Sequence, residues 1–180
     1  KLVKAEYTIK QFDYFQAEQK NPEFVAVNPN AAFPALVDGD FTLWESNAIL
    51  QYAAEKVGDT TAYPVDIKTR SDINRWLLWE SSSWFGSCYI YLVENCVKPL
   101  LGDTTDSNVL ANEEENFHKL ASILDARLAN NTFLCGENPT IADVAVAAPM
   151  HLHGWAKLPL GNHSNLVRWM TENIEKSSWW

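Results

Sequence analysis

The period of the hydrophobic pattern changes once along this chain, and that change limits the folds open to it. Residues 5–45 carry short β-branched and aromatic runs, of which AEYTIKQFDY (5–14) predicts a strand. From residue 68 onwards the apolar residues repeat at the helical spacing. The stretch GDTTAYPVD (58–66) between them has no periodicity. The sequence therefore predicts a small α/β unit over residues 1–57, a linker over 58–67 and an all-helical unit over 68–180.

Local turn and cap signals organise the α/β unit. The segments ALV and FTL flank Asp38-Gly39, a dipeptide typical of a two-residue hairpin turn. The segment SNAILQYAAEK (46–56) follows as a predicted helix with Ser46 as its N-cap. A short helix is expected within NPEFVAVNP (21–29), because its first proline suits a helix start and its second cannot continue one.

The helical unit begins with a long apolar stripe. Residues 68–97 predict one helix that is bent near Gly86 and stopped by Pro99. Thr140 and Asp143 form a capping box at the start of a helix that is apolar on all sides. The helix between these two has its apolar face at Phe117, Leu120, Leu124 and Leu128.

Composition excludes several classes of protein. Lys plus Arg is 14 and Asp plus Glu is 23, a net charge of −9, whereas a nucleic-acid partner requires a basic face. No apolar run reaches the roughly 20 residues of a membrane span, and KLVKAEYTIK is not a signal peptide, so we expect a cytoplasmic protein without a membrane partner. Three cysteines fit neither a disulfide framework nor a zinc pattern. No metal site is expected from the scattered histidines, which are His118, His151, His153 and His163.

Four residues around the predicted hairpin form the candidate site. A cis Phe33-Pro34 bond would turn the N–H and C=O of Phe33 away from the sheet, where they can pair with a peptide-like ligand. A helix N-terminus at Ser46 offers N–H groups and a hydroxyl to a carboxylate, and the carboxylate of Glu45 can take an ammonium. One tight hairpin brings the two pairs to the same edge, so the set suits the zwitterionic head of an amino acid. Taken singly, each residue has an ordinary structural role as a strand start, a first-turn carboxylate or an N-cap.

Residues 28–56, NPNAAFPALVDGDFTLWESNAILQYAAEK, closely resemble the glutathione-binding half of cytosolic glutathione S-transferases. The pattern of that family is Asn-Pro-x-Gly-x-Val-Pro-x-Leu, a hairpin, and then Glu-Ser-x-Ala-Ile. The resemblance continues through RWLLWE (75–80), VKPLLG (97–102) and TIAD (140–143) to the last residues. It implies a thioredoxin-like α/β domain followed by an all-α domain, most like the bacterial and theta-like groups.

The resemblance also implies roles for single residues. Phe33, before a cis Pro34, would bond the cysteinyl part of glutathione through its backbone. Glu45 and Ser46 would hold the γ-glutamyl ammonium and carboxylate. In this family the electrophile pocket lies between the domains and uses the first long helix. Its candidate residues here, whose alternative role is core packing, are Trp84, Phe85, Cys88 and Tyr89.

Two departures from the family pattern stand out. Ala31 and Ala32 replace the Gly and the Lys or Gln of many relatives, so a side chain for the glycine end of glutathione is absent. The family's catalytic Ser, Tyr or Cys, which stabilises the thiolate, lies in or just after a first strand and before or within the helix that follows it. The sequence lacks that unit, so the catalytic residue is unknown. We expect a preceding strand and helix of roughly 20–25 residues, or another segment in their place.

The resemblance implies a homodimeric glutathione transferase that takes glutathione as co-substrate and adds its thiolate to small hydrophobic electrophiles, as in detoxification. Two alternatives stay open. One is a glutathione-dependent reductase or lyase of the same fold with a cysteine at the activating position. The other is a non-catalytic, transferase-like protein that binds ligands or protein partners, which the absence of Lys at position 32 favours.

Overall fold

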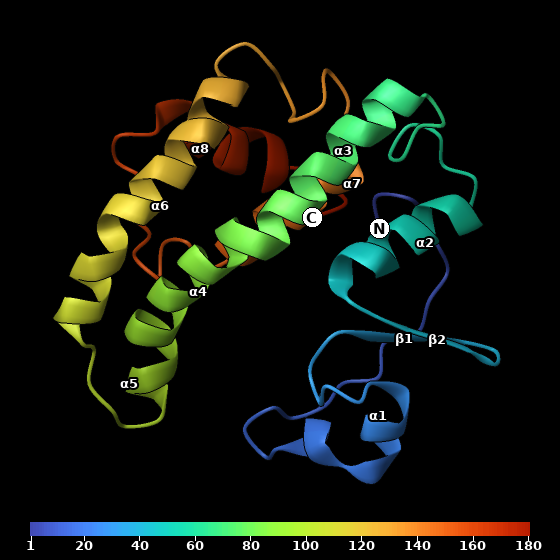
Figure 1. Ribbon diagram of the computed structural model, residues 1–180, viewed down its shortest axis with the longest axis horizontal. Coiled ribbons are helices and arrows are strands. Elements are labelled where there is room, and N and C mark those ends of the chain that lie inside the picture. The colour runs from blue at the N-terminus through green and yellow to red at the C-terminus, as the bar shows by residue number, and fades with distance from the viewer. The chain divides into compact units, whose positions relative to one another are not determined.

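The computed structural model describes all 180 residues of the chain (Figure 1). Residues 3–60 and residues 61–180 form two compact units. This division falls inside the predicted linker, and the predicted boundaries 1–57, 58–67 and 68–180 stay a prediction. No helix of either unit combines the length and the apolar character needed to cross a membrane.

The first unit is built on one antiparallel hairpin. Its elements are the 3₁₀ turn η1 (Glu18–Lys20), α1 (Pro22–Val27), β1 (Ala35–Asp38), β2 (Phe41–Trp44) and α2 (Ser46–Lys56). Ala35 lies opposite Trp44, and Asp38 lies opposite Phe41. The predicted hairpin is confirmed, but its two-residue turn is Gly39-Asp40, because Asp38 still belongs to the ladder. Gly39 supplies the positive φ of +64° that such a turn requires.

The prediction of a strand over residues 5–14 is wrong. These residues form coil and turns, and the side chains of Tyr7 and Ile9 are 60% and 69% exposed. A strand is stabilised by hydrogen bonds to a neighbouring strand and by one buried face. The sheet contains β1 and β2 alone, so this segment has neither. Its β-branched and aromatic composition was not sufficient to make it a strand.

The second unit is helical throughout, as predicted. Its elements are α3 (Ile67–Trp79), the π turn η2 (Glu80–Trp84), α4 (Phe85–Leu92), the π turn η3 (Val93–Val97), α5 (Lys98–Leu100), α6 (Ser107–Leu128), α7 (Ile141–Ala147), the 3₁₀ turn η4 (Ala148–Met150), α8 (Ser164–Arg168) and the π turn η5 (Trp169–Ile174). Its core includes Trp84, Phe117 and Trp169, all fully buried.

The first long helix differs from its prediction in two details. Residues 67–100 are helical without a break, and the irregular turns lie at 80–84 and 93–97 rather than at Gly86. The helix also continues past Pro99 to Leu100. In the turn before this proline, the N–H of Lys98 donates to the C=O of Val93, five residues back. That wider turn accommodates a residue that has no N–H and whose ring clashes with a regular α-helical carbonyl.

The predicted apolar face of α6 and the predicted capping box of α7 are both confirmed. The four apolar residues of α6 are buried. At the start of α7, Thr140 and Asp143 make reciprocal bonds, with the Thr140 N–H donating to the Asp143 carboxylate at 2.8 Å. The other carboxylate oxygen accepts the N–H of Leu134 and the indole N–H of Trp169. Burial raises the pKa of Asp143, while these donors oppose that shift.

Candidate functional site

The loop that precedes β1 ends at a cis peptide bond between Phe33 and Pro34, as predicted. The backbone N–H and C=O of Phe33 make no hydrogen bond within the protein, whereas Ala35 already belongs to the ladder. The ring of Phe33 is anchored, because it packs edge-on against the buried ring of Phe24 with centroids 4.9 Å apart. Phe33 therefore offers one free donor and one free acceptor on a residue whose side chain is held in place.

Glu45 and Ser46 lie where β2 turns into α2. Glu45, not Ser46 as predicted, is the N-cap, and its backbone has φ 73° and ψ 114°. A non-glycine residue at positive φ costs on the order of 1–3 kcal/mol and is found most often at binding sites. No side chain caps this 11-residue helix, and both residues are exposed. The helix start is thus open to an anion, with a carboxylate beside it for a cation.

The hairpin brings these two features together. Ala35 and Trp44 form the first pair of the ladder, so Phe33-Pro34 and Glu45-Ser46 flank the same end of it. Directly opposed residues of an antiparallel pair have Cα atoms about 4.5–5.5 Å apart. The structure therefore places all four predicted residues at one edge of the first unit.

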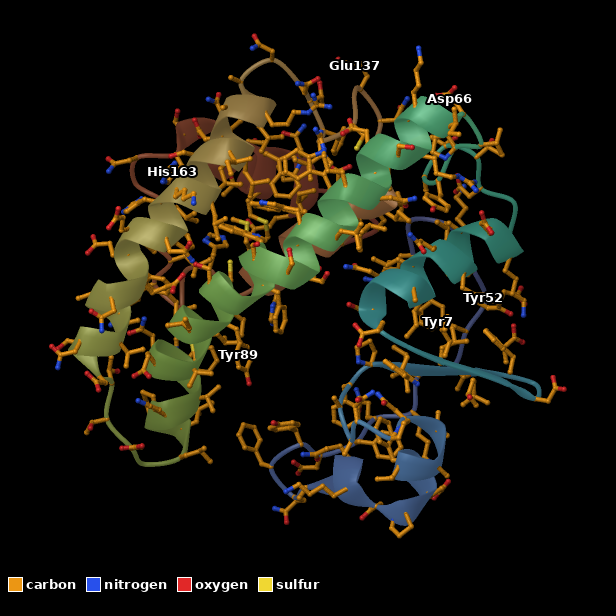
Figure 2. All side chains as sticks on the ribbon, in the orientation of Figure 1. Tyr7, Tyr52, Asp66, Tyr89, Glu137 and His163 are labelled. Carbon is orange, nitrogen blue, oxygen red and sulfur yellow. The ribbon has the colours of Figure 1, made fainter.

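A second contact fixes α2 on the hairpin. The hydroxyl of Tyr52, labelled in Figure 2, donates to the carboxylate of Asp38 at 2.5 Å, and Lys56 pairs with the same oxygen. The hydrogen bond from Lys56, followed by that from Tyr52, lowers the pKa of Asp38. Because Asp38 is the last residue of β1, this contact ties the turn end of the hairpin to α2 and orients the helix start at the other end.

The four predicted electrophile-pocket residues divide into two pairs. Trp84 and Cys88 are 0% and 1% exposed, and the indole N–H of Trp84 donates to the C=O of Val146 at 3.0 Å. Burial raises the pKa of the Cys88 thiol well above its usual value, which keeps it neutral. Both residues belong to the core of the second unit because no part of their side chains is open to a ligand, and we exclude them from the pocket.

Phe85 and Tyr89 form the other pair. They are 47% and 42% exposed, and their rings stack with centroids 5.4 Å apart. Tyr89 projects from α4 in Figure 2. These two side chains are accessible, and they alone of the four stay candidates for contact with an electrophile.

Sequence reasoning missed two arrangements. Asn28 lies at the start of the loop before Phe33 and is 3% exposed. The sequence marks it as the first residue of the Asn-Pro-x-Gly-x-Val-Pro pattern, but that pattern does not reveal a role for its side chain. His118 and His163 were expected to be scattered, yet His118 Nδ1 lies 2.9 Å from His163 Nε2. Across residues 1–180, no group of three or more His, Cys, Asp or Glu side chains is placed to hold a metal ion.

The chain is similar in sequence to known glutathione S-transferases of plants and insects. Probable glutathione S-transferase GSTF2 of Oryza sativa subsp. japonica is 30% identical over 164 residues, which are 91% of this chain and 74% of that protein. The chain belongs to the glutathione S-transferase family. Glutathione S-transferase F10 of Arabidopsis thaliana is 29% identical to this transferase chain over 177 residues, 93% of the chain and 76% of the relative. Glutathione S-transferase D7 of Drosophila melanogaster is 28% identical over 184 residues, which cover 100% of the chain and 78% of the relative.

The two halves of the transferase match separately. The family described as glutathione S-transferase, N-terminal domain, matches residues 1–55, and the C-terminal domain family matches residues 91–176. The crystal structure of glutathione transferase F2 from Populus trichocarpa superposes with a TM-score of 0.88 at 25% identity, over 99% of this chain and 88% of that chain. The structure of glutathione S-transferase-I bound with lactoylglutathione superposes with a TM-score of 0.82 at 27% identity, over 97% of this chain and 84% of that chain.

These matches confirm the thioredoxin-like first domain and the helical second domain that the resemblance implied. They do not confirm the expected bacterial and theta-like subgroup, because the relatives named above come from plants and an insect.

Proposed function

We propose that this transferase conjugates the thiolate of glutathione, its co-substrate, to small hydrophobic electrophiles. The observation that carries the proposal is the pair of free backbone groups on Phe33 at the same hairpin end as the uncapped helix start at Ser46. Family membership supports it. Among the relatives, one structure holds lactoylglutathione and another, glutathione S-transferase I from mais, holds an atrazine glutathione conjugate.

Each part of glutathione has a matching group in the first unit. The N–H and C=O of Phe33 pair with the C=O and N–H of the cysteinyl residue, as an added strand would. The start of α2 and the Ser46 hydroxyl receive the γ-glutamyl carboxylate, and Glu45 receives the ammonium. Phe85 and Tyr89 contact the electrophile through their exposed rings. No residue of the chain is assigned to activation of the thiol.

Two further properties follow from family membership rather than from the geometry. We propose that the transferase is a homodimer and that it acts in the cytoplasm. Sedimentation analysis of the purified protein tests the first proposal, and a single species of 20.4 kDa at micromolar concentration would contradict it.

The site assignment is tested by calorimetric titration with glutathione. Glu45→Ala and Ser46→Ala should each weaken binding by about 1–3 kcal/mol, since each leaves a charged or polar group of the ligand without its partner. Asp40→Asn, which removes a carboxylate from the exposed hairpin turn, is the matched control and should leave the affinity within about twofold. Unchanged affinity in both site variants would refute the assignment, and absence of binding by the wild type at millimolar glutathione would refute the function.

A further inference from the structure

Asn28 is a buried polar residue whose side chain makes three hydrogen bonds inside one loop. It ends α1, where its backbone N–H donates to the C=O of Phe24 at 2.9 Å. Its side-chain Nδ2 donates to the C=O of Ala32 at 2.7 Å. Its Oδ1 accepts the backbone N–H and the side-chain Nδ2 of Asn30, both at 3.0 Å. Because Oδ1 faces a backbone N–H, the orientation of the amide is fixed.

The bond to Ala32 acts on the next residue through the peptide plane. The C=O of Ala32 and the N–H of Phe33 belong to one trans peptide unit, in which they point in opposite directions. By holding the carbonyl of Ala32, Asn28 directs the N–H of Phe33 away from the interior of the loop. That N–H is the donor that makes no bond within the protein.

The same bond also strengthens that donor. A hydrogen bond accepted by a peptide carbonyl polarises the peptide, and the N–H at its other end becomes a better donor. The short distance of 2.7 Å and the burial of Asn28 both favour such polarisation. Asn28 therefore acts on both the direction and the strength of the Phe33 N–H.

We propose that Asn28 is a positioning residue for glutathione, which aims the Phe33 N–H at the cysteinyl carbonyl of the ligand. The inference rests on the proposed function and adds a residue that itself touches no ligand. Asn28 works through the Ala32–Phe33 peptide, while the contact of Phe33 with Phe24 anchors the side chain of the same residue.

Variants of the two asparagines separate this role from loop stability. Asn28→Asp keeps an acceptor for Asn30 but replaces the donor to Ala32 with an oxygen that repels its carbonyl. Calorimetric titration of the full chain should show glutathione binding about tenfold weaker, the effect of one lost hydrogen bond. Asn30→Ala, at an exposed position, removes the side-chain bond to Oδ1 but keeps the backbone N–H bond to Oδ1 and the bond to Ala32. Its affinity should stay within about twofold of the wild type.

A smaller ligand distinguishes positioning from general damage. L-Glutamate carries the head group of glutathione without the cysteinyl residue, so it does not use the Phe33 N–H. Its weak binding, followed by NMR at the Ser46 amide, should be equal in the wild type and in Asn28→Asp. Equal losses for glutamate and glutathione would overturn the proposal, as would equal glutathione affinities of Asn28→Asp and Asn30→Ala.

The wild type provides a test that does not depend on a folded variant. If the chain of bonds from Asn28 through Ala32 and Phe33 to the ligand is cooperative, saturation with glutathione moves two NMR signals downfield together. These are the Phe33 N–H and the Asn28 Nδ2 proton. A shift at Phe33 without one at Asn28 overturns the inference and leaves the proposed function intact. A wild type that does not bind glutathione refutes the proposed function instead.

Discussion

Ala31 holds a left-handed backbone conformation, with φ +51°, two residues ahead of the proposed binding peptide. This region costs an L-residue about 1–2 kcal/mol relative to glycine. The pattern of the family has glycine at this position. The chain therefore keeps a strained residue in the loop that Asn28 holds together, where the hydrogen bonds of the Asn28 side chain with Ala32 and Asn30 offset the strain.

Replacing Ala31 with glycine should stabilise the protein. Ala31→Gly is expected to raise the free energy of unfolding by about 1 kcal/mol, less than the full strain because glycine gains freedom in the unfolded chain. Ala32→Gly is the matched control, since Ala32 has no positive φ, and it should lower the free energy of unfolding by about 0.4–1 kcal/mol. Urea denaturation measures both, and an Ala31→Gly variant less stable than the wild type would contradict the assignment of strain.

At the level of secondary-structure elements, Asp143 joins three parts of the helical unit. Its carboxylate accepts from Leu134 in the loop before α7, from Thr140 at the start of α7 and from Trp169 in η5. The side chain is fully buried. Each of these buried donors would be unpaired without the carboxylate, so Asp143 is required for the packing of this part of the unit.

Asp143→Asn should therefore be strongly destabilising despite its equal size. The amide NH₂ of asparagine is a donor and would face groups that also donate, so at least two buried groups lose their acceptor. We therefore expect the free energy of unfolding to fall by about 3 kcal/mol or more. Asp106→Asn makes the same chemical change at the exposed N-cap of α6, where it accepts from Asn108. Asn caps helices as well as Asp, so this control should change little. Thermal unfolding followed by circular dichroism compares the two variants, and similar melting temperatures of Asp143→Asn and Asp106→Asn would argue against the role of Asp143.

A hydrogen bond between two histidines joins α6 to the residue that precedes α8. His118 Nδ1 and His163 Nε2 are 2.9 Å apart and the ring centroids 5.2 Å apart, so the two nitrogens lie between the rings, nearly on one line. That alignment suits an N–H···N bond and not two ligands converging on a metal ion. Burial, followed by the charge of His118, lowers the pKa of His163, and Asp125 partly opposes this. Glu114, at 4.0 Å from Nε2 of His118, is the other charged group beside the pair.

A lowered histidine pKa makes stability fall on acidification. Above a pH of about 6.5, His163 is neutral in both the folded and the unfolded protein, so its lowered pKa does not reduce the stability of the fold. As the pH falls below that value the unfolded chain takes up the proton first, and stability is lost until the lower folded pKa is reached. Melting temperatures between pH 8 and 5 should decline below pH of about 6.5, and His163→Asn should flatten the decline. His151→Gln, at an exposed histidine, should leave the decline of the melting temperature unchanged. A His163→Asn variant whose melting temperature declines as steeply as that of the wild type would contradict the role of the pair.

On the scale of the whole molecule, the features that could be predicted from the sequence are those encoded by neighbouring residues. The helix 46–56 was predicted over its observed range, although its N-cap is Glu45 and not Ser46, and the apolar face of α6 follows directly from its period. The candidate site could be predicted for the same reason. Phe33 and Ser46 are brought together by one hairpin, whose turn residues lie between them in the sequence.

The features that could not be predicted depend on partners far along the chain or on geometry without a sequence marker. His118 and His163 meet only because α6 packs against α8. The segment 5–14 has strand composition, but a strand also requires a neighbour that composition does not reveal. Asn28 is marked in the sequence only as the first residue of the family pattern, and the proposed role of its side chain depends on its bond to Ala32, which the structure shows.

The π turn at 80–84 makes the surface that follows it sensitive to insertion and deletion. A π turn holds one residue more than an α turn, and successive helical residues are about 100° apart. Trp76 and Trp84, eight positions apart, would lie about 80° apart on a regular helix, but the extra residue brings both to one buried face. Loss of one serine from Ser81–Ser83 would rotate α4 by about 100° and change which of its residues face outward. Relatives that differ by one residue here would present different side chains in place of Phe85 and Tyr89, so gaps in this turn could diversify the surface without any substitution in α4.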